Sequence, residues 1–203
     1  MAAIPTAGDT LRLRDVAQVP RAERLDSVSW GPPSLRVATS QGLASVWLLR
    51  AADTVFIVAR VADRTPSFAD FVAVCLDVGG DRSEAPGHDD FQLALHRTLD
   101  SSVVYRGRAG RWEAPLDDPD WRVGPVHQGG GWSATVADDG TAWTLVLKLD
   151  PAWLAGQDGR PAAIAFQLHD DDPNRWYGWP DTGDAATLDR APSRWAVTLA
   201  SPP

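Results

Sequence analysis

Runs of alternating apolar and polar residues recur along this chain, and short breaks rich in glycine, proline and aspartate separate them. The run at 141–149 is the clearest, with Trp143, Leu145 and Leu147 in one phase and threonine, valine and lysine between them. Successive side chains of a β-strand point to opposite faces of its sheet, so this period of two predicts strands with one buried face. The pattern therefore favours a fold built from sheets rather than helices.

Further runs extend this pattern over most of the chain. Those at 54–62 and 71–76 are apolar in both phases, which is typical of strands in the middle of a sandwich. Other runs predict strands at 35–39, 45–51, 90–98, 103–106, 133–136, 162–169 and 195–199. Helical sequence is scarce, and only residues 150–156 combine a capping aspartate, a proline at the first helical position and a glycine stop. Three loops of unusual composition lie at 77–90, 115–131 and 169–180.

This order of elements predicts an all-β fold, an antiparallel two-sheet β-sandwich of jelly-roll-like form with one short helical turn. No change in composition divides the 203 residues, so we expect a single domain, 1–203, with residues up to about 30 at its periphery. The only cysteine, Cys75, lies in an apolar run. We expect its thiol to be buried and inert.

The charge balance limits the classes of partner. The chain carries 27 acidic and 19 basic side chains, which gives a formal net charge of −8. Phosphate groups require a basic surface, so this balance disfavours nucleic acids and anionic membranes. The N-terminal residues have neither the basic start nor the apolar segment of a signal peptide, and no run is long enough to cross a bilayer. As given, the chain is therefore expected to be cytoplasmic.

Tryptophan is the residue most over-represented here, with ten copies. Trp47, Trp143 and Trp195 fall in the apolar phases of their strands, and we expect them in the core. Trp176 and Trp179 instead lie with Tyr177 in the polar segment 169–180. Indole faces pack against the C–H faces of sugars, and the indole N–H can donate to a hydroxyl. This segment is therefore a candidate saccharide site, and packing is the alternative.

The loop at 77–90 is the main candidate for a metal site. It has five acids and three glycines, and Asp77, Asp81 and either Asp89 or Asp90 could face one ion. Calcium takes six to eight oxygen ligands from carboxylates, carbonyls and water. The alternative is a solvated hairpin whose aspartates and glycines form turns. The acidic run 170–172 is a second, weaker candidate.

Two strands carry polar side chains in matching phases. Gln92 and His96 share one phase, as do Gln167 and His169. If these strands are neighbours, their side chains form a polar patch on one sheet face, which either hydrogen-bonds a ligand or is an ordinary solvated surface. The histidines lack the spacing of a zinc site. The chain has no nucleophile elbow, phosphate loop or dinucleotide fingerprint, and no spacing selects a pair of catalytic carboxylates.

Several segments, taken in order, resemble the family 9 carbohydrate-binding modules, a branch of the DOMON-like β-sandwiches. Val-Ala-Arg-Val-Ala-Asp at 58–63 resembles a strand that ends in aspartate, and Asp-Phe-Val-Ala-Val-Cys-Leu-Asp at 70–77 resembles the central strand. The hairpin after it, the strand and proline turn at 143–156, and the acidic, Arg-Trp and Trp-Pro segment at 169–180 complete the match. The resemblance runs from Val46 to Leu199.

The resemblance implies a β-sandwich that binds a saccharide chain end between two aromatic rings, with structural calcium in its loops. Members usually sit inside secreted multidomain enzymes such as glycoside hydrolases. The ligand-binding residues expected here are Trp176, Trp179, Tyr177, Arg175, Phe68, Arg97, Gln92, His96 and His169. The expected calcium ligands are Asp77, Asp81, Asp89 and Asp90. Two positions depart from the pattern: Ala73 replaces a glutamate that binds sugar hydroxyls, and Phe68 stands where a second tryptophan is usual.

Three functions follow from this reading. The first is a non-catalytic carbohydrate-binding module for an oligosaccharide or polysaccharide chain end. The second is an interaction domain that keeps the sandwich and has lost the sugar site, which Ala73 and Phe68 would explain. The third is a glycoside-active enzyme, which the abundant acids alone suggest.

Overall fold

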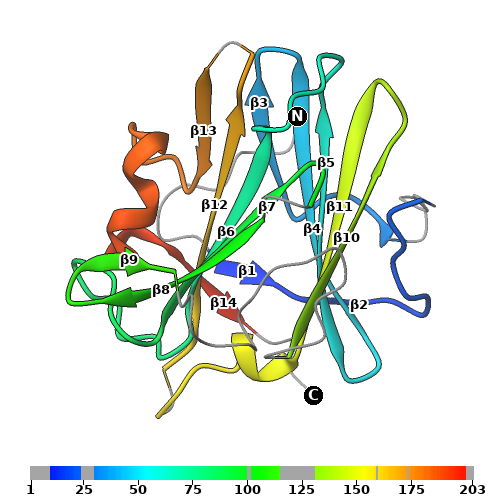
Figure 1. The fold of residues 1–203 in the computed structure, drawn as a ribbon. Coiled ribbons are helices and arrows are strands. Elements are labelled where there is room, and N and C mark those ends of the chain that lie inside the picture. Colours follow the sequence, from blue (N-terminus) through cyan, green and yellow to red (C-terminus); the bar gives the residue numbers. More distant parts are fainter. Residues whose placement is uncertain are drawn as a thin grey trace.

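Two β-sheets pack face to face in the computed structural model of the chain (Figure 1). The structure describes residues 10–23, 30–99, 102–114, 131–158, 160–172 and 174–199, and most of the loop expected at 115–131 lies outside them. Among the described residues, no helix is long and apolar enough to cross a membrane.

The larger sheet has eight strands in the order β1-β14-β12-β6-β7-β8-β9, and β13 pairs with β12. Their bounds are β1 Thr10–Arg12, β14 Ala196–Leu199, β12 Ala163–Asp170, β6 Phe71–Asp77, β7 Asp90–His96, β8 Val103–Arg108, β9 Arg111–Glu113 and β13 Arg175–Trp179.

The smaller sheet has six strands in the order β10-β11-β5-β4-β2, and β3 pairs with β4. Their bounds are β10 Trp132–Asp138, β11 Ala142–Leu149, β5 Thr54–Ala62, β4 Gly42–Ala51, β2 Arg14–Asp15 and β3 Leu35–Thr39. β1 runs parallel to β14 and β2 runs parallel to β4, whereas the other pairs are antiparallel. The all-β sandwich is confirmed, with two short parallel pairs added to the expected antiparallel ones.

The main core lies between the sheets and follows the predicted alternation. Trp143, Leu145 and Leu147 of β11 are fully buried in it, with apolar residues of β6, β7 and β12. A second cluster on the other face of β5 packs Phe56 against Trp47, which explains why that strand is apolar in both phases. Removing a side chain such as that of Trp143 leaves a cavity and costs about 3–5 kcal/mol.

The N-terminal segment is not peripheral, contrary to the prediction. β1 extends the larger sheet through β14, and β2 extends the smaller sheet through β4. Leu11 and Leu13 are buried in the main core, and Ala22 and Trp30 belong to the second cluster. The two leucines are only two residues apart, so one short extended stretch can bury both.

Three short 3₁₀ helices complete the described structure: η2 Pro151–Leu154, η3 Ala185–Arg190 and η4 Pro192–Arg194. The turn at η2 is the predicted one, capped by Asp150. The other two were not predicted, and Figure 1 shows η3 beside β12 and β13. Leu188 and Trp195 cover Cys75 there, on the face of the larger sheet away from the main core. The expected burial of this thiol is confirmed.

Candidate functional site

Four aromatic side chains lie side by side across the outer face of the larger sheet. In the strand register Phe71 is opposite both His96 and His169, and Trp176 is opposite His169. The ring centroids of Phe71 lie 5.0 Å from His96 and 5.4 Å from His169, and those of His169 and Trp176 lie 4.6 Å apart. We call these four residues the aromatic row. Such spacings are those of packed aromatic pairs.

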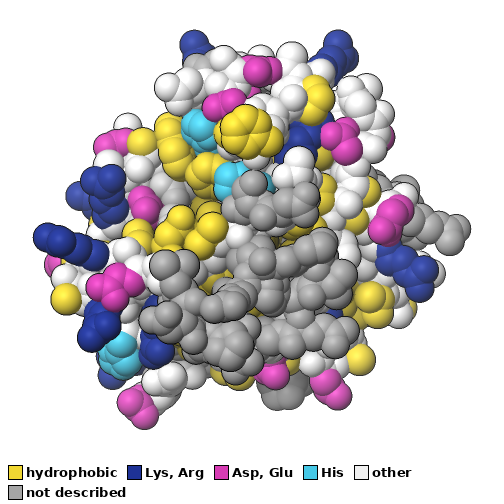
Figure 2. Space-filling model, in the orientation of Figure 1, with side chains coloured by type: hydrophobic (Ala, Val, Ile, Leu, Met, Phe, Trp, Pro, Cys, Tyr) yellow, Lys and Arg dark blue, Asp and Glu magenta, His cyan; other side chains and the backbone are white. Residues whose placement is uncertain are grey.

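Trp176 of the aromatic row and Phe68 in the neighbouring loop are open to solvent, unlike most large apolar side chains among the described residues. Trp176 is 37% exposed, and Phe68, in the loop before β6, is 73% exposed. Figure 2 shows histidine side chains beside hydrophobic ones on this face of the molecule. Exposed aromatic rings next to polar groups are the usual composition of a site for an amphipathic ligand.

Both histidines hold the loop that carries Phe68. His96 Nδ1 lies 3.1 Å from the carbonyl oxygen of Phe68, and His169 Nδ1 lies 3.2 Å from that of Ala69. A carbonyl oxygen only accepts, so the ring nitrogen that faces it must carry the proton and donate. In a neutral His96 the proton is therefore on Nδ1, and Nε2 is a hydrogen-bond acceptor. The predicted polar phase of these two strands is confirmed, although the strands flank β6 instead of pairing directly.

Gln92 and Gln167, which share the polar phase of the two histidines, form hydrogen bonds that hold the 3₁₀ helix η3. Gln167 Nε2 donates to the carbonyl oxygen of Ala185 at 2.7 Å, and Gln92 Nε2 donates to Gln167 and Asp189 at 3.3 Å each. These bonds attach η3 to the sheet. The predicted contact of Gln92 with a ligand is therefore replaced by a structural role. Ala73, fully buried between the strands, forms the floor beside the aromatic row.

The segment expected as a loop at 169–180 is a β-hairpin, and this changes the roles of its aromatic residues. β13 alternates, so Arg175, Tyr177 and Trp179 point away from the face that carries Trp176. Trp179 is only 1% exposed and lies in the main core, so the prediction of a surface indole at this position is wrong. Tyr177 packs on the core, and its hydroxyl accepts from Ser40 N at 2.9 Å.

Arg97 was also expected to contact a ligand, and this prediction is wrong. Its side chain is buried at the end of β7, where Nη1 lies 2.8 Å from Asp63 Oδ2 and 3.3 Å from Asp70 Oδ2. Its Nε donates to Asp138 at 2.6 Å. A guanidinium held by three carboxylates between the sheets cannot turn to the outer face without leaving those charges uncompensated.

Three of the four predicted calcium ligands lie close together at the loop between β6 and β7. Carboxylate oxygens of Asp77, Asp81 and Asp89 all lie within 4.8 Å of one another. Gly80 N and Arg82 N donate to Asp77 at 2.6 and 2.8 Å, which fixes its orientation. Two ligands of one calcium ion are at most about 5 Å apart, twice the Ca–O distance. These three residues therefore fit the ion.

Asp90 differs from the other three predicted ligands. It is opposite Asp77 across the strand pair, and both are fully buried. Burial, followed by repulsion from Asp77, raises the pKa of Asp90 to about 7, although a hydrogen bond from Gly87 N opposes this. Burial also raises the pKa of Asp77. Two buried carboxylates facing each other favour a neighbouring cation or a retained proton.

Two surface hollows accompany these sites. One, of about 330 Å³, runs along β13 and is lined by Trp176, Tyr177 and residues 36–38 of β3. The other, of about 680 Å³, lies on the outer face of the smaller sheet above Trp47. Arg60 lines the second hollow and is bound to Asp139 at 2.7 Å. Only the first hollow adjoins the aromatic row.

The comparisons with known proteins concern the fold. No model of a known protein family matches the chain, and no curated protein matches it. Two similar solved structures are family 9 carbohydrate-binding modules from Caldicellulosiruptor kristjanssonii. The one in complex with glucose is 13% identical, with a TM-score of 0.55 over 96% of this chain and 97% of that one. The one in complex with cellotriose is 12% identical, with a TM-score of 0.57 over 96% and 95%. The chain therefore has the fold of a family 9 carbohydrate-binding module.

Proposed function

We propose that the protein is a non-catalytic carbohydrate-binding module whose saccharide lies against Trp176 and Phe68 beside the aromatic row. The observation that carries this proposal is a pair of exposed aromatic rings on a face lined with histidines. The solved structures of the same fold hold glucose and cellotriose, which supports a glucose-type ligand.

The chemistry of this face suits a pyranose ring. The apolar C–H face of a sugar packs on an indole or phenyl ring, while its hydroxyls need donors and acceptors at the rim. His96 Nε2 can accept a hydrogen bond from a sugar hydroxyl, because His96 Nδ1 faces the Phe68 carbonyl. Asn174, 3.2 Å from His169 Nε2, lies at the other end.

The ligand we propose is a chain end. Along the strands the aromatic row is bounded by η3, which covers Ala165 and Cys75, and by the loop that carries Phe68. The row is thus confined along the strands, and the resemblance to family 9 modules supports a chain end as the ligand. No pair of catalytic carboxylates is required for this role.

Binding can be tested by calorimetric titration of the chain with glucose and cellotriose. We expect saturable binding that Phe68→Ala weakens, because this substitution removes a phenyl ring that is largely exposed to solvent. Leu43→Ala is the matched control, since Leu43 is another exposed large apolar residue but lies on β4 of the other sheet. Absence of binding to both sugars at millimolar concentrations would refute the proposal for glucose-type ligands.

We further propose that Asp77, Asp81 and Asp89 hold a structural calcium ion. Its charge would offset the buried carboxylates of the hairpin and fix the β6–β7 connection. Gly79 supports this reading, because a Cβ at that position would collide with the Asp89 carboxylate. Only glycine lets Asp89 approach the other two acids so closely.

An interaction domain without sugar binding is the second candidate. Ala73 favours it, because the floor of the proposed site lacks the carboxylate that the resemblance leads us to expect. The same titration separates the two functions.

A further inference from the structure

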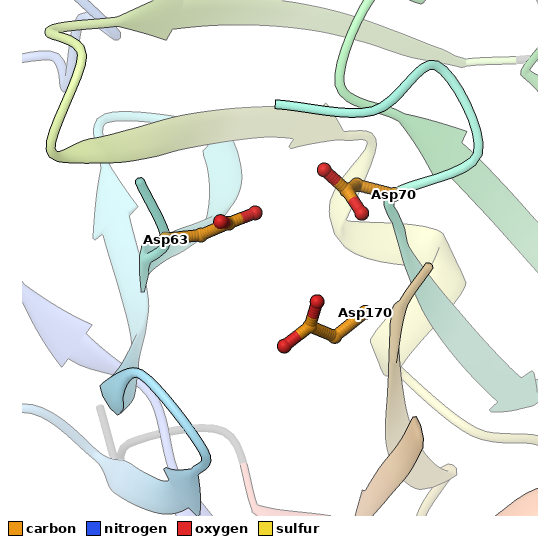
Figure 3. Close-up of side chains that lie close together, drawn as sticks. All are labelled: Asp63, Asp70 and Asp170. Carbon is orange, nitrogen blue, oxygen red and sulfur yellow. The ribbon is translucent and has the colours of Figure 1, made fainter. Parts of the chain in front are cut away.

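The loop that carries Phe68 is held at both ends. It runs from Asp63, which follows β5, to Asp70, which precedes β6, and both aspartates are buried. Figure 3 shows their side chains directed at a common space, together with that of Asp170 at the end of β12. Arg97 Nη1 lies 2.8 Å from Asp63 Oδ2 and 3.3 Å from Asp70 Oδ2, so one guanidinium joins the two ends. The loop is therefore anchored between the sheets.

Within this loop, Ser67 makes hydrogen bonds in three directions. Its backbone N donates to Asp70 Oδ2 at 2.8 Å, and its Oγ accepts from Ala69 N at 3.2 Å. The same Oγ donates to Asp171 Oδ2 at 2.6 Å, across 104 residues of sequence. A hydroxyl that donates to a carboxylate at this distance forms one of the stronger, charge-assisted bonds. The residues on either side of Phe68 are therefore fixed, while its own side chain projects into solvent.

Asp171 belongs to the segment that carries the other exposed ring. It lies in the turn between β12 and β13, and β13 contains Trp176. Its backbone N donates to Asp70 Oδ1 at 3.0 Å, and His169, at the end of β12, holds the carbonyl oxygen of Ala69 at 3.2 Å. Together with the Ser67 bond, these contacts join the turn to the loop. The two exposed rings are distant in sequence but stand on segments that are bonded to each other.

The exposure of Phe68 indicates what these bonds achieve. The side chain is 73% exposed, although burying apolar area lowers the free energy. In a flexible loop such a ring would turn onto neighbouring apolar surface. A loop that is fixed on both sides of the ring keeps it in solvent, where a ligand can meet it. Fixing a binding group before the ligand arrives removes part of the ordering cost of binding.

We propose that Ser67 and Asp171 are positioning residues, whose bond presets the Phe68 ring relative to Trp176 before a saccharide binds. We call this pair the loop clip. Neither side chain has to touch the saccharide, because the clip acts through the phenyl ring. Its role in binding rests on the saccharide site proposed above, whereas its effect on the loop can be measured without any sugar.

Calorimetric titration with cellotriose tests the role in binding. Ser67→Ala removes the donor hydroxyl and should raise Kd about three- to tenfold, because losing one hydrogen bond lowers the population of the correctly held loop. Ser67→Thr keeps a hydroxyl and should stay within about twofold of the native Kd. Asp171→Ala should resemble Ser67→Ala. Asp172→Ala is its control, since Asp172 is exposed in the same turn and should leave Kd unchanged.

A double substitution separates positioning of the ring from a general loss of structure. If Ser67 acts through Phe68, adding Ser67→Ala to a Phe68→Ala chain should not raise Kd further. If Ser67 only supports the fold, Ser67→Ala should weaken binding by the same factor in both chains.

NMR relaxation of the Phe68 backbone amide measures the clip in the sugar-free chain. Its order parameter should fall from about 0.85 to below about 0.6 in Ser67→Ala and should be retained in Ser67→Thr. An unchanged order parameter in Ser67→Ala would overturn the proposal, and so would an equal loss of affinity with and without the Phe68 ring. A native chain that binds neither glucose nor cellotriose refutes the saccharide site, and the relaxation measurement then decides alone whether the clip holds the loop.

Discussion

Replacing Trp176 by alanine should weaken saccharide binding, and the exposed area of the indole ring determines how large the loss of affinity should be. The indole is 37% exposed. A tryptophan side chain offers about 150–250 Å² of surface, so about 55–95 Å² is free to contact a ligand. At about 25 cal/mol per Å² this is worth about 1.4–2.4 kcal/mol. Since about 1.4 kcal/mol is tenfold in affinity, we expect Kd to rise about 10- to 50-fold.

Calorimetry or NMR titration with cellotriose measures this change, and the thermal midpoint checks that the fold is intact. Trp176→Phe keeps an aromatic face of smaller area and should fall between the native chain and the alanine variant. Leu43→Ala should leave Kd unchanged. If Trp176→Ala shifts Kd by less than about twofold, the indole contributes under about 0.5 kcal/mol and does not support the ligand.

Three further substitutions test other features. The first concerns Asp90, measured with a chelator present to remove calcium. The pKa of Asp90 is near 3.8 in the unfolded chain and about 7 in the folded chain, so only the folded chain keeps the proton between these values. The free energy of unfolding should therefore fall by up to about 4 kcal/mol as the pH rises from about 4 to 7. Asp90→Asn should flatten that decline in urea titrations, and an unchanged slope would show that Asp90 does not cause it. Arg97→Ala leaves Asp63 and Asp70 buried without their cation and should cost about 3–5 kcal/mol of stability; a loss below 1 kcal/mol by urea unfolding would contradict the role given to this ion pair. Gly107→Ala places a Cβ against the Gly87 carbonyl and should displace the β6–β7 hairpin, costing about 1–3 kcal/mol and weakening the calcium binding proposed for this hairpin; an unchanged calcium affinity in this variant would show that the contact is not critical.

Local pattern was sufficient to predict most of the strands and much of the core. The alternation of apolar and polar residues predicted β11 and the burial of Trp143. The apolar residues on both faces of β5 predicted a central position for that strand. β13 was missed because a five-residue strand that contains a glycine and follows an acidic turn resembles a loop. Because the segment was expected to be a loop, Trp179 was predicted to lie at the surface. In a strand, successive side chains point to opposite faces, and this alternation turns Trp179 into the core.

The site could be predicted only in part, because its geometry depends on strand order. His96 and His169 meet at Phe71 since both strands flank β6, a relation that spacing along the chain does not contain. Arg97 shares the apolar phase of Leu93 and Leu95, but its charge alone indicates a surface residue. Its burial depends on Asp63 and Asp70, which the fold alone brings to it. The hairpin acids were predictable because they are close in sequence.

The N-terminal strands β1 and β2 limit how far the chain can be shortened from that end. Residues 10–12 complete an edge of one sheet, and residues 14–15 join the other. A version that starts after residue 15 would lose a strand from each layer together with Leu11 and Leu13, and would expose the edges of β14 and β4 to pairing with other molecules. Recombinant versions trimmed at this end should therefore keep Thr10, even though the sequence motifs that resemble family 9 modules begin only at Val46.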